Sequence, residues 1–137
     1  MKRILVIDDE PHILLMVKKM LERAGYEVDL ASNGSEGLRL FRELMPGLVI
    51  TDIIMPEKEG LETIREMKRI SGDLKIIAMS GGGKISADNY LETAKIFGAS
   101  RLVEKPFSQK QLLTYVEELV GPGREDNSKS NFSEPAV

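Results

Sequence analysis

Residues 48–60 read LVITDIIMPEKEG, and this stretch decides the fold. The apolar and β-branched run over residues 48–51 predicts a short buried strand, and Asp52 follows where that strand leaves the core. Pro56 pushes the residue before it away from helical geometry, and Gly60 supplies freedom to turn. The stretch therefore presents one carboxylate at the tip of a strand, beside a constrained loop.

The rest of the chain alternates short apolar runs with amphipathic segments. The expected strands cover residues 3–7, 26–31, 48–51, 74–79 and 101–103, and the expected helices cover residues 11–24, 33–45, 61–70, 85–97 and 108–120. Five strands alternating with five helices predict an α/β protein whose parallel sheet is covered on both faces. Residues 121–137 are polar and lack periodicity. We therefore expect one domain over residues 1–120 and a disordered polar tail over residues 121–137.

Composition narrows the class of protein. At 137 residues with 42% hydrophobic content, the chain can bury one sizeable core. The absence of cysteine excludes disulfides, thiol nucleophiles and cysteine-based zinc sites. A net charge of -3 argues against direct nucleic-acid binding, and the apolar run at residues 4–7 is too short for a signal peptide or a spanning helix. We expect a cytoplasmic protein without membrane insertion.

Polar side chains follow the expected strands at the ends where a parallel sheet binds its ligands. They are Asp8, Asp9, Asp52, Ser80 and Lys105. Three neighbouring carboxylates repel one another unless a cation intervenes, and oxygen ligands alone favour a hard ion such as Mg²⁺. A carboxylate, a divalent cation, an ammonium and a hydroxyl together predict phosphoryl transfer, with Asp52 as the nucleophile that forms an acyl phosphate.

Four separated motifs resemble the receiver domain of response regulators, the phosphate-accepting half of two-component signalling. They are the acidic pair Asp8-Asp9, the segment DIIMPEKEG that begins at Asp52, the hydroxyl of Ser80, and Lys105-Pro106-Phe107. The resemblance covers residues 3–120. It implies a flavodoxin-like, doubly wound fold with strand order 2-1-3-4-5, and we interpret the chain as a stand-alone receiver whose only reaction is on itself rather than an enzyme.

The resemblance also implies the donor and the metal ligands. A histidine kinase or a phosphotransfer protein of a phosphorelay would donate the phosphoryl group to Asp52. Mg²⁺ would be held by Asp9, Asp52 and the backbone carbonyl of Ile54, with Asp8 acting mainly through water.

The remaining implied roles concern the phosphoryl group and the switch. Ser80, Gly81 and Lys105 would contact the bound phosphoryl group, and the bond from Lys105 to Pro106 would be a cis peptide. The family usually carries an aromatic residue where this chain has Leu102, which is a departure from its aromatic switch. We hypothesise that the glycine-rich loop over residues 81–84 carries much of the response instead.

Downstream signalling is expected to use the face made by the fourth helix, the fifth strand and the fifth helix. That face would bind a protein target, and the chain would be a monomer or a phosphorylation-dependent dimer. The sole histidine, His12, is interpreted as a surface residue of the first helical turn.

Three alternatives remain open from the sequence. A Mg²⁺-dependent phosphatase of the haloacid dehalogenase type also uses an aspartyl nucleophile, but it needs an acid two residues later, where this chain has Ile54. A flavodoxin-like nucleotide binder is electrostatically poor because of the acids at the phosphate-binding edge. A receiver-like protein that binds partners without phosphorylation is the third, and the complete set of acids, hydroxyl and lysine argues against it.

Overall fold

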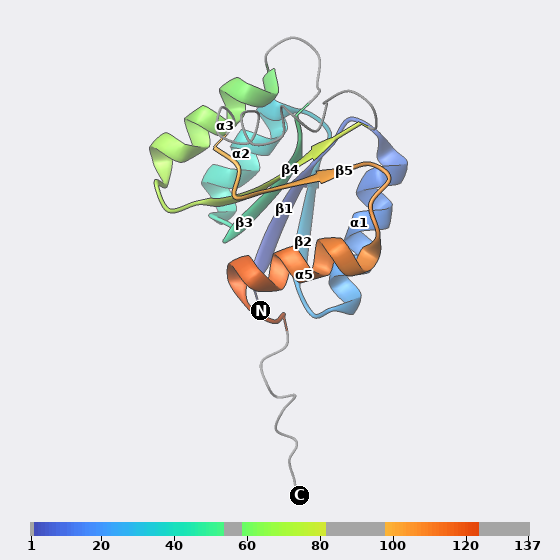
Figure 1. The fold of residues 1–137 in the computed structure, drawn as a ribbon. Helices are drawn as coiled ribbons and strands as arrows, with labels where there is room; N and C mark the ends of the chain where they lie inside the picture. Colours follow the sequence, from blue (N-terminus) through green and yellow to red (C-terminus); the bar gives the residue numbers. More distant parts are fainter. Residues whose placement is uncertain (1, 54–58, 82–97, 124–137) are drawn as a thin grey trace, which may run out of the picture.

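The structure is a computed structural model, and it describes residues 2–53, 59–81 and 98–123. The strands are β1 (Arg3–Ile7), β2 (Glu27–Ala31), β3 (Leu48–Asp52), β4 (Lys75–Ser80) and β5 (Arg101–Glu104), and the helices in these ranges are α1 (Pro11–Arg23), α2 (Gly34–Leu44), α3 (Glu59–Ile70) and α5 (Gln109–Val120). All strand pairs are parallel, in the order β2-β1-β3-β4-β5 (Figure 1). The predicted doubly wound, flavodoxin-like fold is confirmed.

Helices cover both faces of the sheet, α1 and α5 on one face and α2 and α3 on the other (Figure 1). The side chains of β1 alternate accordingly: Ile4 and Val6 join the core cluster under α1 and α5, whereas Leu5 and Ile7 join the cluster under α2 and α3. Gly37 lets α2 approach β1 closely, because a Cβ there would lie 2.5 Å from the Cδ1 of Ile7. Burial on both faces explains why the strands read as continuous apolar runs.

The predicted helix starts are visible as side-chain caps. Asn33 Oδ1 accepts a hydrogen bond from the backbone N–H of Glu36 at 2.8 Å, and Ser108 Oγ accepts one from the N–H of Gln111 at 3.0 Å. The side chain of Glu36 in turn accepts a hydrogen bond at Oε1 from the backbone N–H of Ser32, at 3.0 Å, instead of from that of the N-cap residue Asn33. Both caps fix where the chain turns from a strand end into a helix.

Three expectations differ from the structure or fall outside the described residues. Gly60, expected to supply a turn, lies inside the first turn of α3, where packing of the helix outweighs the weak helix propensity of glycine. The helix expected over residues 85–97 lies outside the described residues. The same holds for residues 82–84 of the glycine-rich loop, of which only Gly81 is described.

The packed chain continues past α5 into a segment that we call the C-terminal clasp, residues 121–123. The hydroxyl of Tyr26 donates to the first carbonyl of the clasp at 2.7 Å, and the ammonium of Lys2 donates to the second at 3.0 Å. Gly123 is buried so tightly that a Cβ there would lie 2.5 Å from the carbonyl oxygen of Ala24. The domain therefore extends three residues beyond the predicted boundary, and the rest of the predicted tail lies outside the described residues.

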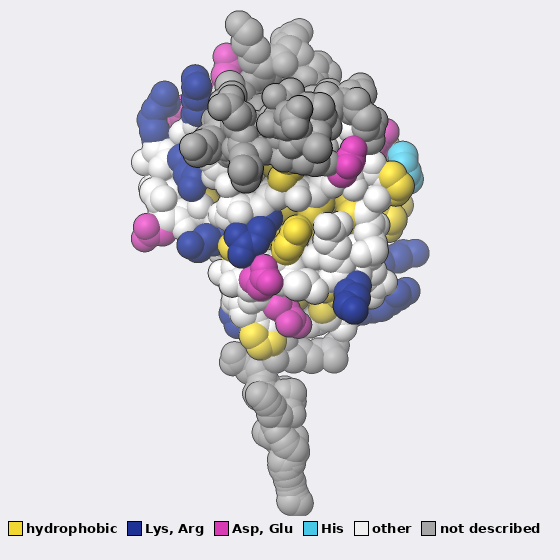
Figure 2. Space-filling model, in the orientation of Figure 1, with side chains coloured by type: hydrophobic (Ala, Val, Ile, Leu, Met, Phe, Trp, Pro, Cys, Tyr) yellow, Lys and Arg dark blue, Asp and Glu magenta, His cyan; other side chains and the backbone are white. Residues whose placement is uncertain are grey.

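The surface carries a few large apolar side chains. On α1, Leu15 is 56% exposed and Met16 is 41% exposed. His12 is exposed on the same helix, as predicted, and apolar side chains lie beside it (Figure 2). Among the described residues, no helix has the length and apolar character required to cross a membrane.

Candidate functional site

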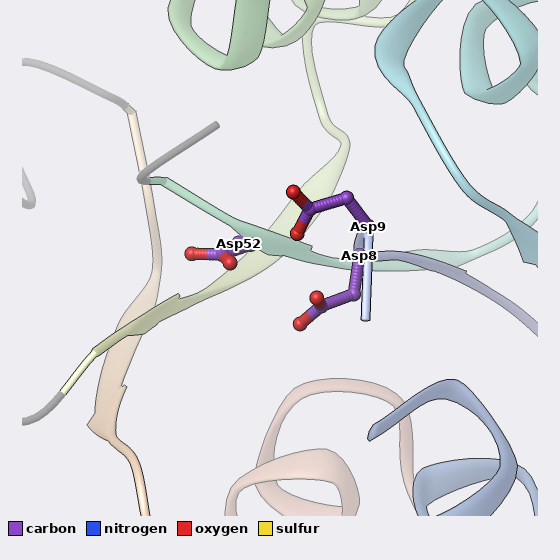
Figure 3. A group of neighbouring side chains, drawn as sticks. All are labelled: Asp8, Asp9 and Asp52. Carbon is purple, nitrogen blue, oxygen red and sulfur yellow. The ribbon is translucent and has the colours of Figure 1, made fainter. Parts of the chain in front are cut away.

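The carboxyl ends of four parallel strands bring the predicted site residues to one edge of the sheet. Asp8 and Asp9 follow β1, Asp52 ends β3, Ser80 ends β4, and Lys105 follows β5. Figure 3 shows the three acidic side chains, two from the loop after β1 and one from the end of β3. Residues that are up to 97 positions apart in the sequence thus meet, as the parallel topology predicts.

The three aspartates form a compact acidic cluster. Asp8, Asp9 and Asp52 each offer one carboxylate oxygen, and these oxygens all lie within 4.8 Å of one another. Asp8 is fully buried and Asp52 is 5% exposed, whereas Asp9 is exposed. Three oxygen donors at this spacing, without a thiolate or an imidazole, suit a hard divalent cation. The chemistry of the cluster therefore fits a metal ion.

Lys105 supplies the opposite charge to this cluster. Its Nζ lies 2.8 Å from Asp8 Oδ2, 3.1 Å from Asp52 Oδ2 and 3.3 Å from Glu10 Oε1, and its side chain is only 13% exposed. Burial alone would lower the pKa of Lys105, but the hydrogen bonds and charges of Asp8 and Asp52 outweigh it and raise that pKa above its ordinary value. The ammonium is therefore held in its charged form between the carboxylates.

Asp8 illustrates the balance of forces in the cluster. Burial raises the pKa of Asp8 above its ordinary value of 3.8, and the nearby charge of Asp52 adds to this effect. The hydrogen bonds from Lys105 and from the backbone N–H of Glu10, at 2.8 and 2.9 Å, act in the opposite direction. Its negative charge is therefore tolerated only with its partners in place, and an additional cation would favour it further.

Ser80 provides a buried hydroxyl beside the cluster. Its backbone carbonyl accepts a hydrogen bond from the N–H of Lys105 at 2.7 Å, which ties the end of β4 to the residue after β5. Its Oγ is fully buried and is the one buried side-chain polar atom, among the described residues, without a hydrogen-bond partner. Because such a group normally finds a partner, the hydroxyl is available to a ligand at this edge.

The other predicted site residues have mixed outcomes. Gly81 is half-buried directly after β4, and Leu102 is half-buried on β5, in register with Ala78 of β4. The peptide bond between Lys105 and Pro106 is cis, the geometry that the resemblance implies. The backbone carbonyl of residue 54, predicted as a metal ligand, lies outside the described residues.

One residue of the site was missed by sequence reasoning. Glu10 sits in the acidic run after β1, but nothing in the sequence pairs it with Lys105, which is 95 positions away. The available signal was its place beside Asp8 and Asp9, since a third acid in that run adds to the negative charge that Lys105 faces.

Comparisons with known proteins show what the whole chain is similar to. The family model described as the response regulator receiver domain matches residues 4–117. The chemotaxis protein CheY of Thermotoga maritima is 36% identical over 113 residues, covering 82% of this chain and 92% of that protein. The response regulator protein TrrA of the same organism, solved in complex with Mg²⁺-BeF, has a TM-score of 0.74 and 37% identity, covering 88% of this chain and all of TrrA (100%).

Longer relatives also match. The probable transcriptional regulator ycf27 of Porphyra purpurea is 36% identical over 134 residues, which cover 98% of this chain but 53% of that protein. The chain thus spans about half the length of this relative. None of these matches gives support to the phosphatase of the haloacid dehalogenase type.

Proposed function

The chain belongs to the response regulator receiver domain family and is a phospho-accepting signalling module, and from this premise we propose that Asp52 is its phosphoryl acceptor. The observation that carries the proposal is the position of Asp52, which shares one ammonium with Asp8 and lies in a carboxylate cluster that suits a metal ion. The donor is a phosphohistidine of a histidine kinase or of a phosphotransfer protein.

The proposed reaction is a displacement at phosphorus. A carboxylate oxygen of Asp52 attacks the phosphorus, the bond from phosphorus to the imidazole nitrogen breaks, and the electron pair of that bond returns to the imidazole. Lys105, 3.1 Å from Asp52 Oδ2, stabilises the charge of the transferred oxygens, and the Ser80 hydroxyl and Gly81 backbone donate hydrogen bonds to them. Water later cleaves the acyl phosphate and restores the carboxylate.

The proposal includes Mg²⁺ as the bound cation. Asp9 and Asp52, together with the backbone carbonyl of Ile54, would bind it directly, and Asp8 would contact it mainly through water. When bound by these residues, the ion would supply positive charge to the carboxylates and to the phosphoryl oxygens. The donor set supports this choice, because hard oxygen ligands converge within 4.8 Å.

The output of the module is a change in partner binding. We assign the target surface to the expected fourth helix, residues 85–97, which lie outside the described residues, together with β5 and α5. We expect phosphorylation to alter this face in a cytoplasmic monomer or a phosphorylation-dependent dimer. Leu102 lies on β5 at the position where the resemblance calls for an aromatic switch. Its half-buried side chain is aliphatic, so this chain has no aromatic ring at that position to change rotamer on phosphorylation.

Labelling with acetyl phosphate and Mg²⁺, followed by intact-protein mass spectrometry, tests the acceptor. Wild-type protein is expected to gain one phosphoryl group, and Asp52→Asn is expected to gain none. Asp73→Asn is the matched control, because Asp73 is exposed in the turn before β4, at the opposite end of that strand from the site. Equal labelling of Asp52→Asn and wild-type protein would show that the acceptor is another residue.

A further inference from the structure

Glu10 is the residue of this site whose arrangement the proposed reaction does not explain. It occupies the N-cap of α1, and its carbonyl accepts hydrogen bonds from the N–H groups of Ile13 and Leu14. Its side chain makes no capping hydrogen bond and instead reaches Lys105, with Oε1 3.3 Å from Nζ. Aspartate or serine at this position would serve the helix better. The side chain of Glu10 therefore contacts Lys105 instead of capping α1.

The Lys105 ammonium has three N–H donors, and three carboxylates stand around it. Two of them, Asp8 and Asp52, are buried, whereas the side chain of Glu10 is 49% exposed. To bind a phosphoryl oxygen, the ammonium must redirect one donor. The contact that can be given up at least cost is the one with Glu10, because water can solvate its exposed carboxylate, whereas a buried acid would lose its compensating charge.

We propose that Glu10 is a positioning residue that occupies the third donor of Lys105 in the unphosphorylated protein and releases it to the phosphoryl group. The inference rests on the proposed function, since it assumes that Lys105 binds the phosphoryl group on Asp52. Glu10 thereby competes with the phosphoryl group, and its removal makes the site bind a phosphoryl mimic more tightly. The expected gain is about two- to fivefold, the range of an exposed ion pair.

Two variants separate the contact of Glu10 from its charge. Glu10→Gln keeps the shape of the side chain and removes the charge. Glu10→Asp keeps the charge but shortens the side chain by about 1.5 Å, which takes the carboxylate out of hydrogen-bond range of Lys105. Glu10→Asp also places a favoured N-cap residue before α1, so this variant is expected to fold at least as stably as wild-type protein.

The assay is calorimetric titration of beryllofluoride in the presence of Mg²⁺, with Glu62→Gln as the control that removes one exposed charge from α3. Tighter binding by both Glu10 variants, with Glu62→Gln unchanged, supports the inference. Unchanged affinity in Glu10→Asp together with tighter binding in Glu10→Gln overturns it, because charge alone would then explain the effect. Unchanged or weaker binding in both variants also overturns it.

These outcomes are distinct from a failure of the proposed function. If wild-type protein binds no beryllofluoride in the presence of Mg²⁺, the receiver site itself is misassigned. If wild-type protein binds it and both Glu10 variants match the control, the site stands and the competition between Glu10 and the phosphoryl group is refuted.

Discussion

Replacing Lys105 with methionine removes the charge between the carboxylates while keeping a side chain of similar length. The ammonium lies 2.8 Å from Asp8 and 3.1 Å from Asp52, and neither acid has appreciable contact with water. Without metal, the variant leaves two neighbouring buried carboxylates without their shared positive partner. We expect Lys105→Met to unfold at a clearly lower urea concentration than wild-type protein.

The loss in free energy of unfolding caused by Lys105→Met can be bounded from below and from above. Removing one partner of a buried ion pair destabilises a protein by about 3–5 kcal/mol. In the variant, Asp8 can lose its negative charge by taking up a proton. Protonating a carboxyl group with an ordinary pKa of 3.8 at pH 7 requires about 4 kcal/mol, so the destabilisation cannot exceed about this value. The half-exposed Glu10 contributes less than about 1 kcal/mol. The free energy of unfolding is therefore expected to fall by about 3–4 kcal/mol at pH 7.

The pH dependence follows from the raised pKa of Asp8. The folded protein binds this proton more tightly than the unfolded chain, so stability decreases as the pH rises from 3.8 through the higher pKa of the folded state. The hydrogen bond from Lys105 lowers the pKa of Asp8 and so opposes the effect of burial. Without Lys105, the pKa of Asp8 in the folded protein should be higher, and the loss of stability with rising pH should continue to a higher pH. The difference between variant and wild-type protein should therefore shrink as the pH is lowered towards 4.

Urea unfolding followed by circular dichroism, in buffer with EDTA, measures this difference. Lys110→Met is the matched control: Lys110 is exposed at the start of α5, and its loss should change the free energy of unfolding by less than about 0.5 kcal/mol. Added Mg²⁺ should return part of the stability of Lys105→Met, because the proposed metal site, Asp8, Asp9 and Asp52, is assembled only in the folded protein. A Lys105→Met variant as stable as wild-type protein, or a loss independent of pH, would refute the reasoning.

Two further predictions concern the end of the domain opposite the acidic cluster. Burial, and to a lesser extent the charge of Glu117, raise the pKa of Tyr26 to about 12. The ultraviolet phenolate absorbance of wild-type protein minus that of Tyr26→Phe should therefore titrate near pH 12. A difference that titrates near pH 10 would show that this hydroxyl is solvated. Gly123→Ala places a methyl group 2.5 Å from the carbonyl oxygen of Ala24 and should lower the free energy of unfolding by about 1–3 kcal/mol. Gly72→Ala is the control and should have little effect, because a Cβ at Gly72 would have no atom within 4 Å. Equal urea midpoints for the two variants would mean that the C-terminal clasp adds no stability.

The sequence predicted the sheet and the edge where its polar residues meet for one physical reason. A parallel sheet buries both faces of its strands, so each strand reads as an apolar run that ends at the polar residue leaving the core. Asp52 was therefore recognisable as a strand tip, and the common direction of the strands was enough to place Asp8 and Lys105 beside it. Neither inference required knowledge of side-chain packing.

Features that depend on close packing between distant segments were not predictable. The C-terminal clasp reads as a disordered tail because glycine and proline predominate, yet Gly123 is buried because it has no Cβ to collide with Ala24. The contact of Glu10 with Lys105 joins an exposed acid to a lysine 95 positions away, and no periodicity marks it. Gly60 fails as a turn signal because a local propensity of about 1 kcal/mol is overridden by the packing of α3.

Three residues at one edge of the sheet go against the usual preferences of their residue types for solvation, hydrogen bonding or helix capping. Asp8 is a carboxylate buried against its preference for water, the Ser80 hydroxyl has no partner among the described residues, and Glu10 takes an N-cap position without capping the helix. Under the proposed function, a bound cation would compensate the acids, a phosphoryl group would accept hydrogen bonds from Ser80 and Lys105, and Glu10 would lose its contact with Lys105 in return. The buried acid and the buried hydroxyl would then both gain partners on phosphorylation, and this difference between the two states would favour the phosphorylated one, as a reversible switch requires.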